Sequence, residues 1–327
     1  MTLLLTRRDV ADLLPMDACI EAVEHAFRLH GDGRAHPPGV LGVHGLGGGF
    51  HIKAGILELD RRYFAAKTNA NFPDNPLRYE LPTIQGIVFL ADADRGSPLA
   101  VMDSGEITAL RTAAATAVAA RYLARDDAAT ATVCGCGLQG RMQLRALAAV
   151  RPLTRAYAVD HDPARAAAFA REMSAALGFE VSAVTDLDAA ARASDICVTC
   201  TPSREPLLHR GAVAPGTFIA AVGADNEDKQ EIEPALMAES VIVVDVLEQA
   251  ATIGDLHHAL LAGAVTTTDV RAELGQVVAG VRPGRRSENE IIVFDSTGMA
   301  LQDVAAAAAV YERAVRAGRG VDIDLSA

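Results

Sequence analysis

The sequence lacks any apolar run long enough to cross a membrane. A transmembrane helix needs about 18 or more uninterrupted apolar residues, and no segment of the 327 residues offers such a run. The first residues, MTLLLTRRDVADLLP, contain three consecutive leucines before two arginines and an aspartate, which is unlike a secretory signal peptide. We therefore expect a cytoplasmic protein with no membrane partner.

Clusters of basic residues are missing as well. The chain has 30 lysines and arginines against 42 aspartates and glutamates, a formal charge of −12 at pH 7, and it has no Lys/Arg-rich run. Such a chain is a poor partner for nucleic acid or for a membrane surface. A small anionic substrate remains compatible with this charge, because a few local cations are enough to bind it.

Cysteines are few and odd in number. Without a secretion signal, five cysteines favour reduced thiols. Cys197 and Cys200 have the spacing of a metal or redox pair, but no second pair follows at zinc-ligand spacing. The run DICVTC predicts a strand, in which positions three apart point to opposite faces. We expect buried thiols and no metal site.

Lysine is scarce too. Only Lys53, Lys67 and Lys229 stand among the 30 basic residues, and the others are arginines. A retained lysine can mark a place that needs a compact, titratable ammonium group, although chance retention explains any one of them equally well.

Residues 1–118 predict an α+β domain. Apolar residues recur at helical spacing up to His30, and Pro15 is expected at the first helical position. Short extended runs separated by glycine and proline then indicate an antiparallel sheet. The segment NANFPDNPLRYELP indicates a loop, and Asp103 with Glu106 resembles a capping box for the following helix.

From Ala129 onward, strands and helices alternate. This pattern is typical of an α/β fold with a doubly wound, Rossmann-type parallel sheet. A last helix over 298–317 is expected to pack back on the first domain. The sequence therefore predicts two domains, 1–118 plus 299–327 and 119–298.

A glycine motif supports a dinucleotide site in the second domain. Gly135, Gly137 and Gly140 form G-x-G-x-x-G between an apolar strand and a helix. This context favours a tight turn, close approach of the backbone to a pyrophosphate, and close packing of helix on strand. Asp160 ends the next strand and would accept both ribose hydroxyls while repelling the 2′-phosphate of NADP. We expect NAD as the cofactor, with a glycine turn that holds no ligand as the alternative.

The motifs YFAAKTNANFP, ITALRTAAATAVAARYLA, CGCGLQG, TCTPS, AVGADNEDKQE and IIVFDSTGMALQDVA occur in this order. On the basis of these motifs, essentially the whole chain resembles the ornithine cyclodeaminase/mu-crystallin family. The resemblance implies an enzyme, a homodimer formed through the antiparallel sheet domain, and one of several activities. The family includes ornithine and lysine cyclodeaminases, alanine dehydrogenases, ketimine and pyrroline-2-carboxylate reductases, and hormone-binding crystallins.

The resemblance also implies roles for three residues. Lys67 matches the active-site lysine, Arg111 the arginine that holds the substrate carboxylate, and Asp225 the catalytic aspartate. A forked guanidinium suits bidentate carboxylate binding, and Asp225 follows a sheet strand at its carboxyl end, where open α/β sheets bind ligands. The structural alternatives are that Lys67 is a charge at a sheet edge, that Arg111 is a solvated helix residue and that Asp225 caps the following turn.

These roles suggest a mechanism. Arg111 anchors the carboxylate, hydride leaves the α-carbon for the nicotinamide, Asp225 acts as general acid or base, and Lys67 offsets developing negative charge. The reverse reaction reduces an imino acid, and a cyclodeaminase would return the hydride after ammonia has left. The expected cofactor contacts are Gly135, Gly137, Leu138, Gln139, Gly140, Asp160, Thr112, Thr201, Ser203, Val222, Lys229 and Ser296.

One segment departs from the family pattern. Many members carry a basic residue where Gly39 follows the segment His36-Pro37-Pro38, and an M-P-A-like segment where this chain has His51-Ile52-Lys53-Ala54. His51 and Lys53 point to the same face of a strand, so we hypothesise that they replace the missing cation and bind substrate. A surface strand face is the alternative.

An added cationic pair favours a substrate with an anionic side group over ornithine. The leading interpretation is an NAD-dependent imine reductase or amino-acid dehydrogenase that acts on a small amino or imino acid. The alternatives are an ornithine cyclodeaminase with recycled NAD and a non-catalytic, crystallin-like binding protein.

Overall fold

The computed structural model describes residues 1–36 and 38–325, so Pro37 of the proline segment lies outside the described residues. The chain divides into two compact units. Unit 1 comprises Met1–Arg111 and Met299–Ala327, and unit 2 comprises Thr112–Gly298. Unit 1 has a mixed sheet and unit 2 a parallel one, and the predicted α/β class is confirmed.

The sheet of unit 1 has seven strands, of which five were expected from the sequence. The five expected strands pair antiparallel in chain order, from residues 39–45 at one edge of the sheet to residues 98–103. The other two strands, TLLL at the start and VDI near the end, extend the sheet through one parallel and one antiparallel pairing. The sheet is therefore mixed rather than purely antiparallel, because these short runs pair with strands distant in sequence. In spatial order the strands are β17 (Val321–Ile323), β1 (Thr2–Leu5), β6 (Pro98–Asp103), β5 (Ile84–Asp92), β4 (Arg62–Asn71), β3 (Gly48–Glu58) and β2 (Gly39–Gly45).

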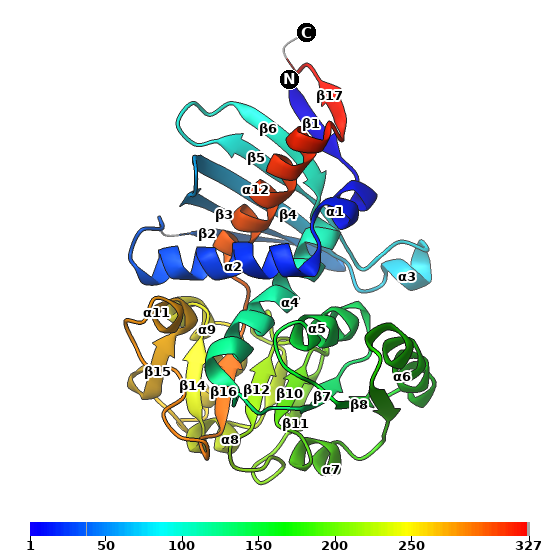
Figure 1. The fold of residues 1–327 in the computed structure, drawn as a ribbon, viewed down its shortest axis with the longest axis vertical. Coiled ribbons are helices and arrows are strands. Elements are labelled where there is room, and N and C mark those ends of the chain that lie inside the picture. Colours follow the sequence, from blue (N-terminus) through cyan, green and yellow to red (C-terminus); the bar gives the residue numbers. More distant parts are fainter. Residues whose placement is uncertain (37, 326–327) are drawn as a thin grey trace. The chain divides into compact units, whose positions relative to one another are not determined.

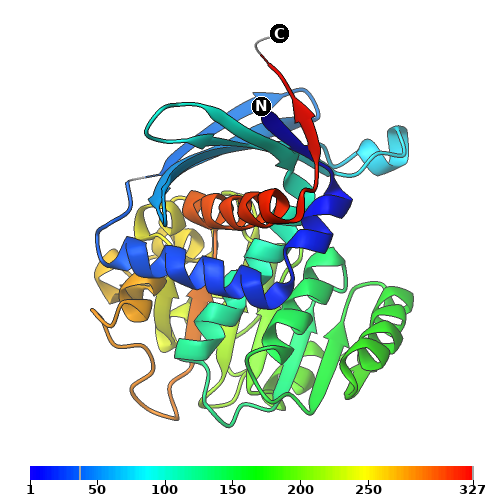
Figure 2. The same ribbon diagram turned by 45° about the horizontal axis from the view of Figure 1, so that its top comes forward.

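Two long helices cover one face of this sheet (Figures 1 and 2). They are α12 (Ala300–Ala317), which packs on β3, β4 and β5, and α2 (Met16–Gly31), which packs on α12. Alanines dominate the buried face of α12 and allow close approach. At Gly55 an added Cβ would stand 3.0 Å from Leu301 Cδ2, so a glycine suits this contact.

The remaining helices of unit 1 correct two expectations. Pro15 is the N-cap of α2 rather than its first residue, because its ψ of 155° is extended. The segment expected to be a loop contains a one-turn helix, α3 (Asn75–Arg78). A further short helix, α1 (Arg7–Leu13), begins at a capping box formed by Thr6 and Asp9.

The other face of the same sheet carries exposed apolar side chains. Side chains alternate along a strand, so one set points away from α12. Leu41 pairs with Ile52 and Val43 with Phe50 in this outward set, and Ile87 follows on β5. Between 44 and 57% of Leu41, Val43, Phe50 and Ile87 is exposed.

Unit 2 contains an eight-stranded sheet in which all pairings are parallel. Three of its central strands are fully buried, as expected for a sheet with helices on both faces. The strand order on either side of Thr130–Cys134, the first strand of the unit, is that of a doubly wound nucleotide-binding fold. The predicted Rossmann-type sheet is therefore confirmed. The strands are, in spatial order, β15 (Val270–Glu273), β14 (Val241–Val244), β16 (Ile292–Asp295), β12 (Phe218–Ala221), β10 (Ile196–Thr199), β7 (Thr130–Cys134), β8 (Arg155–Val159) and β9 (Glu180–Ala183).

Helices connect these strands. A two-stranded sheet, β11 (Arg204–Leu208) with β13 (Gln230–Ile232), lies outside the main one. The chain enters unit 2 through α4 (Ser104–Leu123), where Asp103 Oδ1 accepts the Glu106 N–H at 2.8 Å, one half of the expected capping box. The helices of unit 2 are α5 (Leu138–Ala148), α6 (Pro163–Leu177), α7 (Leu187–Arg192), α8 (Pro234–Glu239), α9 (Leu247–Ala250), α10 (Asp255–Leu261), α11 (Leu274–Val278) and the 3₁₀ turn Thr267–Asp269.

The five cysteines are free thiols. Cys197 lies in the core of unit 2, while Cys200, just after β10, is partly exposed. Burial raises the pKa of Cys197 to about 12, which keeps this thiol protonated. Among the described residues, no helix is long and apolar enough to cross a membrane.

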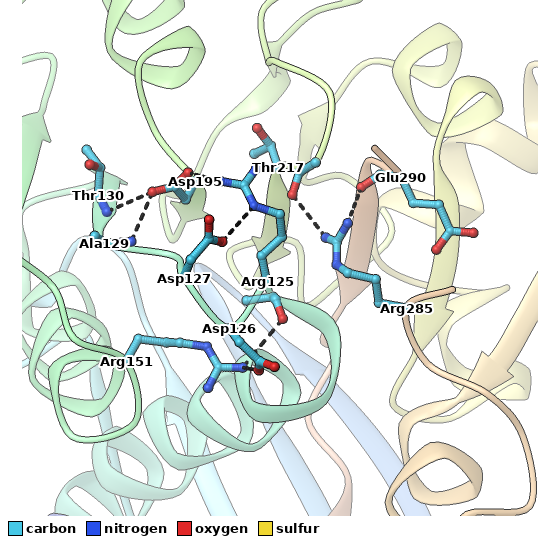
Figure 3. A network of polar contacts seen from close by, with 12 residues as sticks. Arg125, Asp126, Asp127, Ala129, Thr130, Arg151, Asp195, Thr217, Arg285 and Glu290 are labelled. Carbon is cyan, nitrogen blue, oxygen red and sulfur yellow. Dashed lines mark hydrogen bonds and ion pairs between the residues drawn. The ribbon is translucent and has the colours of Figure 1, made fainter. Parts of the chain in front are cut away.

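A polar network fixes the start of the central strands of unit 2 (Figure 3). The Asp195 carboxylate, just before β10, accepts the backbone N–H groups of Ala129 and Thr130 at 3.0 Å each. It also accepts Arg125 Nη2 at 2.7 Å. Arg285 donates to the carbonyl oxygens of Leu123, Gly216 and Glu290. One carboxylate thus joins β7 and β10 to the residues that follow α4.

Asp195→Ala is expected to lower the free energy of unfolding of unit 2 by about 2–4 kcal/mol, because two backbone N–H groups and a guanidinium lose their common acceptor. Urea unfolding followed by circular dichroism measures this loss. The matched control is Glu180→Ala, which removes a carboxylate that is 63% exposed and 3.6 Å from Arg155; its effect should stay below about 1 kcal/mol. Equal losses in the two variants would contradict the account.

Candidate active site

The glycine turn between β7 and α5 has the geometry of a pyrophosphate-binding loop. Gly135 has a φ of +104°, which side-chain-bearing residues rarely adopt. A Cβ on Gly140 would lie 2.1 Å from Gly135 O, so only glycine permits this packing. Gly137 is the N-cap of α5, and a Cβ there would meet nothing within 4 Å. Open space at the start of an 11-residue helix suits a phosphate group.

Asp160 lies beside this turn, immediately after β8. Its Oδ2 accepts the Cys136 N–H at 2.9 Å and its Oδ1 the Asp162 N–H at 3.0 Å. Arg165 Nη1 is 3.9 Å away. Asp160 Oδ1 also lies 3.1 Å from His161 Nδ1. Oδ2 has a further lone pair, which can accept a ribose hydroxyl.

The other predicted cofactor residues of unit 2 follow neighbouring strands. Val222 donates its N–H to Thr199 O at 2.9 Å, and Ser296 donates to Ala221 O at 2.9 Å. These bonds continue the pairing of β10, β12 and β16 to their carboxyl ends. Ser296 Oγ is buried and has no hydrogen-bond partner among the described residues. A buried hydroxyl of this kind suits contact with a ligand.

Asp225 stands in the loop after β12. Its Oδ1 lies 2.7 Å from Lys229 Nζ, and half of its side chain is exposed. The two residues that the sequence assigned to catalysis and cofactor binding therefore form an ion pair.

Glu231 was not predicted, yet it fixes two loops of the site. Its Oε1 accepts the N–H and the Oγ1 of Thr201 at 2.6 and 2.7 Å, and its Oε2 accepts the Gly223 N–H at 2.8 Å. Burial raises its pKa, although these hydrogen bonds oppose the shift. Glu231 connects the loop after β10 with the loop that carries Asp225. Ser203 Oγ follows in the first loop and donates to Glu205 O at 2.7 Å.

A buried ionic cluster occupies unit 1. Lys67 on β4 places Nζ 2.8 Å from both carboxylate oxygens of Asp303 on α12. Arg111 on α4 donates from Nε to Asp303 Oδ1 at 3.1 Å and from Nη1 to Gln302 Oε1 at 3.0 Å. All four residues are at most 6% exposed. The predicted lysine and arginine thus meet at one carboxylate.

The cluster shifts the pKa of both charged partners. Burial, Arg111 and Lys53 lower the pKa of Lys67 to about 7, and Asp303 opposes them. Burial alone would raise the pKa of Asp303, but Lys67 and Arg111 outweigh it and lower that pKa. Near neutral pH, Lys67 is therefore poised between its charged and neutral forms.

Lys53 and His51 lie on the same side of the sheet as Lys67. Lys53 is directly opposite Lys67 in the antiparallel pairing of β3 with β4, and His51 is opposite Asn69. Both side chains are partly buried. The structure therefore brings Lys53, Lys67 and Arg111 together in unit 1.

Asp303 and Gln302 were also missed. They form a polar pair in an otherwise alanine-rich helix, and this break in composition was a signal available in the motif LQDVA. Thr112, next to Arg111 on α4, is buried. Asp225 belongs to unit 2, so its action together with Lys67 and Arg111 stays a prediction. Within the described chain, no group of three or more His, Cys, Asp or Glu side chains is arranged to hold a metal ion.

Comparison with known proteins identifies the family. The model of the ornithine cyclodeaminase/mu-crystallin family matches residues 1–318. The chain belongs to this family. An archaeal alanine dehydrogenase dimer with bound NAD is 38% identical and superposes with a TM-score of 0.95 over 99% of both chains.

Two further structures of the family are similarly close. The Δ1-pyrroline-2-carboxylate reductase of Thermococcus litoralis, in complex with NADH and L-proline, is 35% identical with a TM-score of 0.93, over 98% of this chain and 100% of that one. The iminosuccinate reductase of Paracoccus denitrificans, in complex with NAD⁺, is 34% identical with a TM-score of 0.91, over 98% of this chain and 99% of that one. The family predicted from the motifs is confirmed.

The lowered pKa of Lys67 predicts a pH dependence of stability. Between its folded pKa of about 7 and the ordinary value of 10.5, the unfolded chain binds a proton at Lys67 that the folded chain lacks. Stability of the native protein should therefore rise with pH in this window, relative to Lys67→Met, which has no titrating group there. Urea unfolding of both proteins at several pH values above 7, within this window, measures the difference. A relative stability that falls with rising pH would refute the shift.

Asp160→Ser is expected to weaken discrimination against NADPH. Serine still accepts hydrogen bonds but does not repel a 2′-phosphate, and Arg165 is near enough to attract one. The ratio of the Kd for NADPH to that for NADH should fall by about tenfold or more, equivalent to about 1.4 kcal/mol. Enhancement of nicotinamide fluorescence measures both constants. Asp188→Ser, an exposed aspartate on α7, is the control and should leave the ratio unchanged.

Proposed function

We propose that this protein is an NAD-dependent oxidoreductase that transfers hydride to or from the α-carbon of a small amino or imino acid. The observation that carries the proposal is the buried cluster of Lys67, Arg111 and Asp303. A buried excess of positive charge is unfavourable unless an anion compensates it, and a substrate carboxylate is such an anion.

Arg111 orients the carboxylate in this proposal. Its planar guanidinium favours bidentate binding, and α4 and Gln302 hold it in place. Lys67 adds a second positive charge that stabilises the negative charge developing on the substrate. Asp303 keeps both cations in position, because its carboxylate contacts each of them.

The glycine turn, Asp160 and the loops after β10, β12 and β16 would hold NAD. The open side of Gly137 and the Ser296 Oγ, which has no partner among the described residues, fit a dinucleotide. The three related structures, which contain NAD, NADH or NAD⁺, also support this cofactor. When bound, the nicotinamide exchanges a hydride with the α-carbon. Asp225 acts as general acid or base, giving a proton to the substrate nitrogen in reduction and taking it back in oxidation.

A homodimer and a cytoplasmic location belong to the same proposal. The exposed apolar face of unit 1, with Leu41, Phe50 and Ile87, supports an interface with a second copy, because apolar surface of this kind marks contact sites. One related structure is a dimer. Free cysteines suit a reducing compartment.

The test is a screen of the purified protein with NADH against Δ1-pyrroline-2-carboxylate and against 2-oxo acids with ammonium, read as loss of nicotinamide absorbance. In parallel, ornithine and NAD are assayed for ammonia. Net NADH oxidation with an imine supports the proposal. Ammonia release from ornithine without net NADH formation would show a cyclodeaminase instead, and the absence of any turnover would favour a binding protein.

Asp225→Asn is expected to lower kcat by about 10²–10⁴-fold, because the amide transfers no proton, while the Kd for NADH changes little. Asp228→Asn is the matched control: it removes a carboxylate three residues away in the same loop, 64% exposed and 3.7 Å from Arg204. Its kcat should equal that of the native protein. Equal losses of kcat in both variants would rule out the assigned role of Asp225.

A further inference from the structure

Two carboxyl groups lie next to each other in the interior of unit 2. Asp255 is the first residue of α10 and Asp295 the last residue of β16, and both are 0% exposed. Leu256 donates its N–H to Asp295 Oδ2 at 2.8 Å, and a Cβ on Gly254 would lie 2.9 Å from each oxygen of that carboxyl group. Because the residues on both sides of Asp255 approach Asp295, the two carboxyl groups are close neighbours.

Each of these carboxyl groups leaves one oxygen unused. Asp255 Oδ1 accepts the backbone N–H groups of Glu231 and Ile232 at 2.8 and 2.7 Å. Asp255 Oδ2 and Asp295 Oδ1 are buried and have no hydrogen-bond partner among the described residues. A buried oxygen without a partner is unfavourable. Two such oxygens on neighbouring carboxyl groups satisfy each other when one of them carries a proton, because a protonated carboxyl group donates a hydrogen bond.

The charges around the pair favour that proton. Burial, together with the charge of Glu231 on β13, raises the pKa of Asp255 to about 7. Burial, together with the charges of Asp255 and of Asp245 just after β14, raises the pKa of Asp295 well above its ordinary value. Among the described groups that shift these two pKa values most strongly, none is a cation. Two buried negative charges without a cation are unfavourable, so the pair retains a proton where ordinary aspartates have lost theirs.

The pair lies between three loops of the candidate active site. Asp255 accepts the N–H of Glu231, and the Glu231 carboxylate in turn holds the loops after β10 and β12. Asp295 is followed directly by Ser296, the first residue of the loop after β16. A hydrogen bond between the two carboxyl groups therefore connects all three loops.

We propose that Asp255 and Asp295 share one proton, as a carboxylic acid and a carboxylate, and that this hydrogen bond keeps the three loops in the arrangement that binds the dinucleotide. Both are positioning residues, since they act through Glu231 and the loop of Ser296. When the proton is lost at higher pH, two buried charges repel each other and the loops lose this connection. The shared proton follows from unit 2 alone, whereas its effect on the dinucleotide rests on the function proposed above.

Asp255→Asn tests the shared proton. Asparagine keeps an oxygen for the two backbone N–H groups, and its Nδ2 donates a hydrogen bond at every pH. The pKa of Asp255 is about 7 in the folded protein and 3.8 in an ordinary aspartate, so between these values the folded chain binds a proton that the unfolded chain lacks. In this window the Tm of the native protein should fall with rising pH relative to that of Asp255→Asn. A Tm difference that is constant or changes in the opposite direction overturns the proposal.

A second variant and a control accompany this measurement. In Asp295→Asn, the amide oxygen can accept the Leu256 N–H while Nδ2 donates to Asp255, so the same relative fall of the native Tm is expected. Glu248→Gln changes an exposed carboxylate on the neighbouring helix α9 and should keep the pH profile of the native protein. Native-like profiles in both aspartate variants would show that the pair holds no shared proton.

Binding of NADH measures the connection to the loops. At about pH 6, the Kd of Asp255→Asn should lie within about threefold of the native value. Between about pH 6 and about pH 9, the Kd of the native protein should rise at least about tenfold, and that of Asp255→Asn by less than about threefold. Enhancement of nicotinamide fluorescence gives these constants.

The two measurements separate this inference from the proposed function. If neither protein binds NADH at any pH, the proposed function fails, and the Tm profiles alone decide whether the proton is shared. If both proteins bind NADH and their Kd values change equally with pH, the positioning role is overturned while the function stands.

Discussion

The ionic contacts of Lys67 and Arg111 with the buried carboxylate of Asp303 are the interaction on which the proposed chemistry of unit 1 depends. This carboxylate lies at hydrogen-bond distance from both cations, and Lys53 lies opposite Lys67 on the neighbouring strand. Burial and the two other cations together lower the pKa of Lys67 to about 7. A bound carboxylate would reverse this effect, because it supplies the missing counter-charge. In the proposed function, carboxylate binding and the protonation of Lys67 are therefore linked.

Unit 2 meets a different constraint, which is to hold several loops in register at the carboxyl ends of parallel strands. Backbone bonds at Val222 and Ser296 continue the strand pairing into these loops. Glu231 joins two of them through three hydrogen bonds. At the opposite ends of the strands, Asp195 fixes β7 and β10. A partly buried carboxylate at the start of the strands and a buried one beyond their carboxyl ends thus accept backbone N–H groups that the sheet leaves unpaired.

Features encoded by local pattern could be predicted from the sequence. The glycine turn, the alternating strands and helices of unit 2, and the hairpins of unit 1 all have short-range signatures. Strands β1 and β17 have no such signature, because a run such as TLLL becomes a strand only by pairing with distant segments. Asp303 and Glu231 escaped prediction for the same reason. Glu231 looks like an ordinary surface charge in the sequence, and the break in composition at Asp303 does not reveal its partners. Asp303 binds Lys67, 236 residues away, and Glu231 binds Thr201, 30 residues away.

The most direct test of the central claim is the proton uptake that accompanies carboxylate binding. Calorimetric titration of the NAD-loaded protein with a monocarboxylate, propionate, slightly above neutral pH and in buffers of different ionisation enthalpy, gives the number of protons bound. The account predicts an uptake approaching about one proton per propionate, because the anion restores the charged form of Lys67, and no uptake in Lys67→Arg. A binding enthalpy that is independent of the buffer in the native protein would contradict it.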